Sequence, residues 1–287
     1  MELVGKNNRH WQEFSSVSDC LDFITLDKYI QRESGVYSGA NPPGSINPSS
    51  SGYHRAFLET ARMMRDGWPE GRDKIEEFVI DIEKRVMGYL PIVEVVRDVQ
   101  GDWLDMGALI QGEPECWGQF RDTDYYQERK GGKIIHVVLN IDVTWKPFER
   151  GAAGVAIIDA LERSGHRVVA DAVANTTGKG GRLLETRIRV KESSEPVQLD
   201  KLAFLFAHGD ILRHVLFASW ERLPKPLREL YRFTDGSYGY VGPVPKEDQG
   251  DIYVPREAGH KGSIQDIANY VLDTLRQNGI KIQEEVT

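Results

Sequence analysis

The chain has 287 residues, of which 40% are hydrophobic and 28% are charged, a composition typical of a folded globular protein with one large domain or two modest ones. Its formal net charge at pH 7 is −8. This acidity argues against a protein that coats duplex DNA, because phosphate contacts made by Lys and Arg supply most of that affinity.

Residues 1–52 are predicted to form a flexible lead-in. The second half of this stretch, 34–52, is rich in Gly, Pro, Ser and Asn. Such a composition cannot bury enough apolar surface to fold alone, so it indicates a loop or tether.

Residues 53–130 are predicted to form a mainly helical part. Helices are expected over 54–66 and 69–87, and a strand over 92–96. In the second helix, apolar residues recur at the spacing of one helical face: Ile75, Phe78, Val79, Ile82 and Val86. This stripe predicts that the helix packs against a core.

The remaining chain, 131–287, is predicted to hold an α+β core. Two of its strands, 134–145 and 183–191, alternate polar and apolar side chains. On one side of each strand the residues are mostly polar or charged. They are His136, Asn140, Asp142, Thr144, Glu185, Arg187, Arg189 and Lys191. Since side chains alternate across a strand, such a sheet packs one face on a core and presents the other to water or to a partner.

The order of the elements favours one fold over another. A helix over 151–164, a strand over 167–174 and a hairpin loop over 175–181 connect the two alternating strands. The order strand, helix, strand, strand, helix predicts an open-faced, mostly antiparallel sheet with helices on one side, built on a ferredoxin-like split βαβ core. The alternative is an α/β, von Willebrand A-like sheet with helices on both faces, whose central strands would be continuous apolar runs instead.

The polar side of the sheet is the predicted binding face, with His136, Asn140, Arg187, Arg189 and Lys191 as its contact residues. Its three cations, at alternate positions of one strand, would follow a phosphate backbone, so this local basic stripe makes nucleic acid one expected partner. However, no aromatic side chain alternates onto that side to stack on bases. A solvated face with cross-strand ion pairs is the structural alternative.

A metal site is the second candidate. Asp142 and Thr144 resemble the metal loop of von Willebrand A-like domains, although Lys146 at the next alternate position would compete with a divalent cation. In an enzyme, Asp142 would bind a divalent metal together with carboxylates such as Asp98 and Asp105. No stretch carries a catalytic or cofactor motif, so catalytic residues stay unassigned and no cofactor other than this metal is expected.

The other polar residues indicate no further site. His208 and His214, six residues apart in a helical block, would lie about 240° apart round a regular helix and would not share a face, whereas a break of the helix near Gly209 would bring them together. Cys20 and Cys116 have no metal-ligand spacing and are too few for a disulfide framework, which favours a reducing, intracellular setting. The N-terminus has no signal-peptide pattern, and the apolar runs are far shorter than the ~20 residues of a membrane span.

Three stretches resemble a known family: GEPECW at 112–117, RGAAGVAIIDALERSGHRV at 150–168 and AFLFAHGDILRHVLFASWE at 203–221. They are similar to an uncharacterised protein family carried by tailed bacteriophages. The resemblance implies a viral or prophage origin and a location in the bacterial host cytoplasm or in the virion. It assigns no activity to any residue.

Taken with the open sheet face, these features predict a non-enzymatic, phage-encoded binding or assembly protein. Its expected partner is another protein or a second copy of itself, and no membrane. The first alternative is a metal-dependent enzyme that processes phage nucleic acid. The second is a degenerate von Willebrand A-like interaction module.

Overall fold

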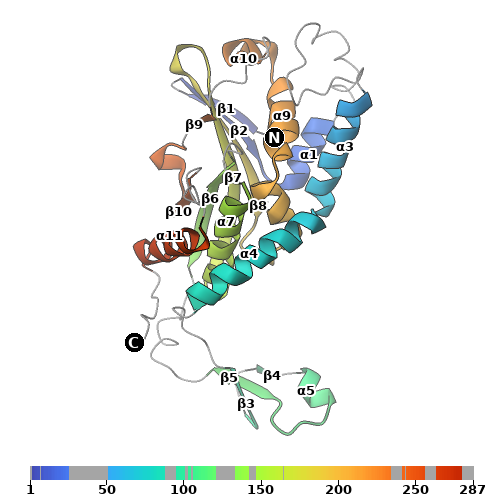
Figure 1. The fold of residues 1–287 in the computed structure, drawn as a ribbon, viewed down its shortest axis with the longest axis vertical. Coiled ribbons are helices and arrows are strands. Elements are labelled where there is room, and N and C mark those ends of the chain that lie inside the picture. Colours follow the sequence, from blue (N-terminus) through green and yellow to red (C-terminus); the bar gives the residue numbers. More distant parts are fainter. Residues whose placement is uncertain are drawn as a thin grey trace.

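Helices cover one face of a mixed β-sheet in the computed structural model of the chain (Figure 1). The structure describes residues 2–6, 8–25, 51–87, 95–100, 103–104, 106–120, 133–141, 147–163, 165–233, 241–242, 244–255 and 263–279. Within these ranges, every helix is too short or too polar to cross a lipid bilayer.

The main sheet combines strands from both ends of the chain. Its strands are β1 (Glu2–Lys6), β2 (Arg9–Phe14), β6 (Ile134–Asn140), β7 (Arg167–Thr177), β8 (Leu183–Lys191), β9 (Val241–Gly242) and β10 (Ile252–Val254). Their spatial order is β1-β2-β8-β7-β6-β10, and β9 pairs with β7. Residues 2–25, expected as part of a lead-in, therefore contribute two strands to this sheet. Of the expected tether, 34–52, residues 34–50 lie outside the described residues and residues 51–52 belong to a helix.

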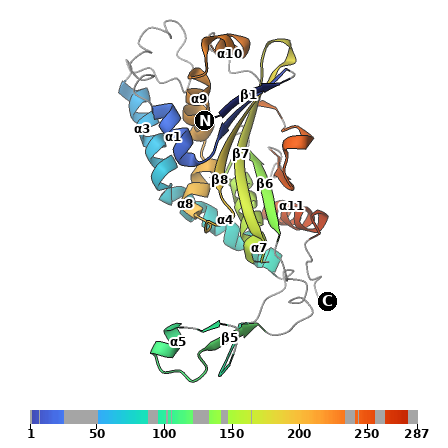
Figure 2. The ribbon, with the colours of Figure 1, turned by 180° about the vertical axis from the view of Figure 1, so that it is seen from behind.

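The helical layer lies on one side of the sheet in both views (Figures 1 and 2). Its helices are α1 (Val17–Thr25), α3 (Ser51–Asp66), α4 (Pro69–Met87), α7 (Pro147–Arg163), α8 (Leu199–Ala207), α9 (Phe217–Glu221) and α11 (Ile264–Gln277). A π-helix, Ile211–Leu216, joins α8 to α9, and the short α10 (Lys225–Leu230) follows. Helix α4 packs on α7, α8 and α11, so residues 69–87 share one core with the C-terminal part.

Small residues in α7 let this helix approach its neighbours closely. A Cβ atom at Gly154 would lie 2.2 Å from Leu139 Cδ2 in β6, and one at Gly151 would lie 2.8 Å from Ala207 Cβ in α8. Both glycines thus allow the close contact of α7 with the sheet and with α8. On α4, the predicted stripe residues Ile75, Val79 and Ile82 are buried in this same core.

The α+β fold with helices on one side is confirmed, and two details of the sheet differ from the expectation. The sheet is mixed rather than mostly antiparallel, because β2 pairs with β8, β7 with β6, and β6 with β10 in parallel. The βαβ unit is not split, since α7 connects the neighbouring strands β6 and β7. Alternation shows which side chains share a face, but it does not determine which strands become neighbours.

A small second sheet forms a unit of its own, called the arm here (residues 95–120). It contains β3 (Val95–Asp98), β4 (Trp103–Leu104) and β5 (Trp117–Phe120) in the order β3-β5-β4, together with α5 (Met106–Ile110). Both views show the arm standing off from the main sheet and its helices (Figures 1 and 2).

Candidate binding face of the main sheet

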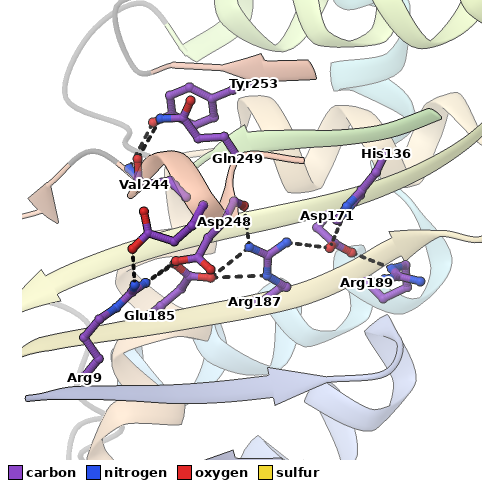
Figure 3. A network of polar contacts seen from close by, with 11 residues as sticks. Arg9, His136, Asp171, Glu185, Arg187, Arg189, Val244, Asp248, Gln249 and Tyr253 are labelled. Carbon is purple, nitrogen blue, oxygen red and sulfur yellow. Dashed lines mark hydrogen bonds and ion pairs between the residues drawn. The ribbon is translucent and has the colours of Figure 1, made fainter. Parts of the chain in front are cut away.

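A buried carboxylate, Asp171, organises the face of the main sheet that the helices leave uncovered (Figure 3). It lies on β7 with a side chain that is only 1% exposed. Arg187 Nη1 donates to Oδ2 at 2.9 Å, and Arg189 Nε donates to Oδ1 at 2.5 Å. His136 Nε2 lies 2.7 Å from Oδ2, and it carries a hydrogen because an ionised carboxylate only accepts.

The three donors keep Asp171 ionised. Burial by itself would raise the pKa of this carboxyl, because a low-dielectric environment penalises the charged form. The hydrogen bonds from His136, Arg189 and Arg187 outweigh that effect and lower the pKa to about 2. Asp171 is therefore a permanent negative charge that fixes three side chains from β6 and β8.

Glu185 on β8 is a second carboxylate with a 1% exposed side chain, in a different electrostatic environment. Its Oε1 accepts from Arg187 Nη2 at 2.9 Å, and Arg9 Nη2 lies 3.9 Å from Oε2. Burial raises the pKa of Glu185, the charge of nearby Asp248 adds to this rise, and Arg187 opposes it. Arg187 thus bridges two carboxylates and links β7 to β8.

One end of the face lies under residues 244–254, the cover segment. Its 3-10 helix η4 (Lys246–Asp248) supplies Glu247 Oε1 to Arg9 Nη1 at 2.7 Å, and Asp248 forms an ion pair with the same guanidinium. The Asp248 carbonyl also accepts from Arg187 Nη2 at 2.8 Å. Arg9 and Arg187 therefore connect the cover segment to the buried carboxylates.

Further contacts position the cover segment against β6. The backbone N–H of His136 donates to Asp251 Oδ2 at 2.8 Å, and the N–H of Asp251 donates to the His136 carbonyl at 2.9 Å. Gly250 has φ +66°, and a Cβ there would lie 2.7 Å from that carbonyl, so glycine is required. A small apolar cluster completes the contact: Val138, Val173, Val244 and Tyr253.

Beside the cover segment, the face has a hollow of about 430 Å³. It is lined by Glu13, Phe14, Ser15, Asp19, Asp171, Arg187, Arg189 and Glu192. Four of these side chains are carboxylates and two are guanidiniums. The guanidinium of Arg189 also donates to Glu192 Oε1 at 2.8 Å. The lining is therefore net acidic, which suits a cationic group of a partner better than a phosphate.

Three of the five predicted contact residues come together on this face: His136, Arg187 and Arg189. Asn140 lies on the same side, but it is buried and its Nδ2 donates to the hydroxyl of Tyr253 at 3.2 Å. Arg187 and Arg189 are paired with carboxylates, so they do not form a row of unpaired cations that could follow a phosphate backbone.

The prediction that Lys191 extends the basic stripe is wrong. Asp171 pairs with Arg189, whereas the preceding residue, Ala170, pairs with Lys191. Here β8 advances by two residues while β7 advances by one, so β8 has a bulge. Beyond the bulge, each side chain of β8 lies on the opposite face from the one that regular alternation predicts.

The bulge turns Lys191 toward the helical layer, where the residue is buried. Its Nζ forms an ion pair with Glu162 of α7 and donates to the Val168 carbonyl at 3.1 Å. A lysine in this position stabilises the contact between β8 and α7 and is not available to a partner.

The predicted metal ligands Asp142 and Thr144 lie outside the described residues, as does Asp105. Within the described stretches, no group of three or more His, Cys, Asp or Glu side chains is arranged to hold a metal ion.

The sequence did contain a signal for Asp171, which was not among the predicted contact residues. It is the one acidic residue of β7, in an otherwise apolar run, and β7 was expected to pair with the strand that carries the cations. A lone carboxylate opposite two arginines indicates a buried ion pair. The cover segment gave no such signal, because its contacts with the sheet join residues far apart in the sequence.

His208 and His214 lie on either side of Asp210, and both side chains approach it. His208 Nδ1 accepts from the Asp210 N–H at 3.1 Å, and His214 Nε2 lies 3.8 Å from Asp210 Oδ1. Helix α8 ends before His208, whose backbone is extended, so the regular α-helical spacing on which the expectation rested does not apply between the two histidines. Burial lowers the pKa of His208, which lines a cavity of about 540 Å³ together with Trp68 of the α3–α4 turn.

Comparison with known proteins identifies one family. Residues 4–282 match the family described as domain of unknown function DUF7192. No curated protein and no solved structure matches the chain. Because the match extends over nearly the whole sequence, the chain belongs to the DUF7192 family.

Proposed function

We propose that this chain is a non-enzymatic, phage-encoded binding or assembly protein that uses the face of the main sheet opposite the α-helical layer. The observation that supports the proposal is the buried carboxylate Asp171 with its three donors, beside an open hollow. One face of the sheet packs against the helices, and the other presents ordered charged groups to a partner.

The degree of burial distinguishes this face from an ordinary solvated sheet. Ion pairs on a solvated face stay exposed and contribute little to stability. Here two carboxylates are buried, although burying charge is costly unless every group is paired. We infer that the network holds the side chains of the hollow in one geometry before a partner binds, which reduces the entropy lost on association.

The chemistry of the hollow supports a protein partner, including a second copy of the chain, over nucleic acid. Its arginines already contact carboxylates, and its rim carries Glu13 and Glu192. A lysine or arginine from a partner would therefore be attracted to the rim. The host cytoplasm and the virion are both compatible with such a role.

Photocrosslinking in cells that carry the natural gene tests the proposal. A photoreactive amino acid replaces Glu13 or Glu192 at the hollow, or Glu77 on the exposed side of α4 as the matched control. We expect both hollow positions to crosslink to the same protein and the control position not to do so. Crosslinks from Glu77 alone, or none from any position, would refute the proposed contact surface.

A further inference from the structure

Exposed large apolar side chains concentrate on the arm. Across the described ranges, nine large hydrophobic residues are exposed, and five of them lie between residues 99 and 117. These five are Val99, Met106, Leu109, Ile110 and Trp117, with exposures from 37% to 81%. A soluble surface rarely gathers such residues in one small unit unless they form a contact.

Few of the arm's side chains whose exposure the structure describes are buried. Among these described side chains, Cys116 is buried, Leu104 is partly buried and the others are exposed. Its strands have four, two and four residues, and α5 has five. The five exposed apolar side chains are therefore not buried within the arm, and another surface is expected to cover them.

The net charge of the arm indicates which kind of surface would cover it. Residues 95–120 contain one base, Arg97, and five acids, which gives 1 − 5 = −4. The whole chain has 36 Lys and Arg and 44 Asp and Glu, so the remainder has 35 − 39 = −4. A second copy therefore offers no net positive charge to the arm, and nucleic acids and anionic membranes are repelled.

We propose that the arm docks a different protein, one that presents an apolar patch bordered by lysine and arginine side chains. Ile110, Leu109 and Met106 of α5 would fill the centre of the contact. Glu113 and Glu115, both exposed in the turn after α5, would meet the basic border. An apolar centre with a charged rim is the usual arrangement of a protein interface. This surface is separate from the hollow on the main sheet.

The test begins with the full chain carrying a photoreactive residue in place of Gln111, which is exposed beside Ile110. A protein captured in cells that carry the natural gene is then purified and titrated into the chain by calorimetry. Capture does not by itself support the proposal, because the affinities of the variants decide. Failure to capture any protein from this position refutes docking by the arm, and it leaves the crosslinks from the hollow as an independent result.

Two variants with the same kind of substitution distinguish specific docking by the arm from non-specific hydrophobic association. Ile110→Asp is expected to weaken binding of the purified protein about tenfold or more, whereas Leu58→Asp, at a 49% exposed position on α3, leaves it unchanged. Glu113→Lys with Glu115→Lys, and added salt, should each weaken it further. Circular dichroism and thermal melting confirm that each variant is folded.

Three results would overturn the proposal. The first is equal weakening by Ile110→Asp and Leu58→Asp. The second is tighter binding after the two glutamates become lysines. The third is sedimentation of the chain alone as a dimer that Ile110→Asp dissociates, because the arm would then dock a second copy instead.

Discussion

Replacing Asp171 by Asn tests whether the buried carboxylate organises the uncovered face. Asn has nearly the same shape, but it removes the negative charge and presents N–H donors to Arg187 and Arg189, which are themselves donors. The side chains of Arg187 and Arg189 are 14% and 29% exposed, so solvent compensates their charges only in part. We therefore expect the variant to fold with reduced stability.

Two independent estimates give the expected loss in the free energy of unfolding. Lowering the pKa of Asp171 from 3.8 to about 2 corresponds to about 2 kcal/mol of preference for the ionised form. Removing one partner of a buried ion pair costs about 3–5 kcal/mol, because a charge is left without compensation. Asp171→Asn should thus lower the free energy of unfolding by about 2–5 kcal/mol.

Urea denaturation at pH 7, with the m-value held in common, measures this difference. Asp273→Asn on α11 is the control, since Asp273 forms an exposed ion pair with Arg276, and it should leave the midpoint unchanged. A loss below about 1 kcal/mol for Asp171→Asn would refute the reasoning, because the network would then behave as a solvated surface.

The pH dependence has a definite sign. The pKa of Asp171 is lower in the folded state than in the unfolded chain, so its contribution is fully present above the unfolded value of 3.8. This stability is lost as the pH falls from about 4 toward about 2. The wild type should lose more stability than Asp171→Asn over this range, and parallel losses would contradict the assignment.

Three further outcomes follow from the same contacts. Glu185→Gln should lower the free energy of unfolding at pH 7 less than Asp171→Asn does, because burial raises the pKa of Glu185 and disfavours its charged form. An equal or larger loss in urea denaturation would contradict this. Asp248→Asn weakens the ion pair with Arg9, so hydrogen exchange at the His136 amide, which the cover segment protects, should become faster; unchanged exchange would mean that the apolar contacts alone hold the segment. Calorimetric titration of the wild type with magnesium or manganese should give no binding heat, and a heat that Asp142→Ala abolishes would favour the metal-dependent alternative instead.

Local patterns in the sequence predicted the parts of the fold that depend on periodicity. The stripe of Ile75, Val79 and Ile82 on α4 and the alternation of β6 and β8 require only that a buried face be apolar. For this reason the α+β class and the single helical layer could be expected. The same alternation placed His136, Arg187 and Arg189 on one side.

Features set by tertiary contacts were not predictable in this way. The bulge that redirects Lys191 arises where β8 pairs with β7, and alternation assumes that no residue is inserted. The parallel pairing of β2 with β8 joins residues about 170 positions apart. The end of α8 before His208 similarly places both His208 and His214 beside Asp210.

Hydrogen exchange of the full chain, alone and with the purified protein captured at Glu13, tests the sheet face opposite the α-helical layer most directly. We predict protection of the β2 and β8 peptides that line the hollow, residues 9–15 and 183–192, and unchanged exchange in α4. Protection confined to α4 and the other helices, with β2 and β8 unaffected, would contradict the assignment of this face as the contact surface.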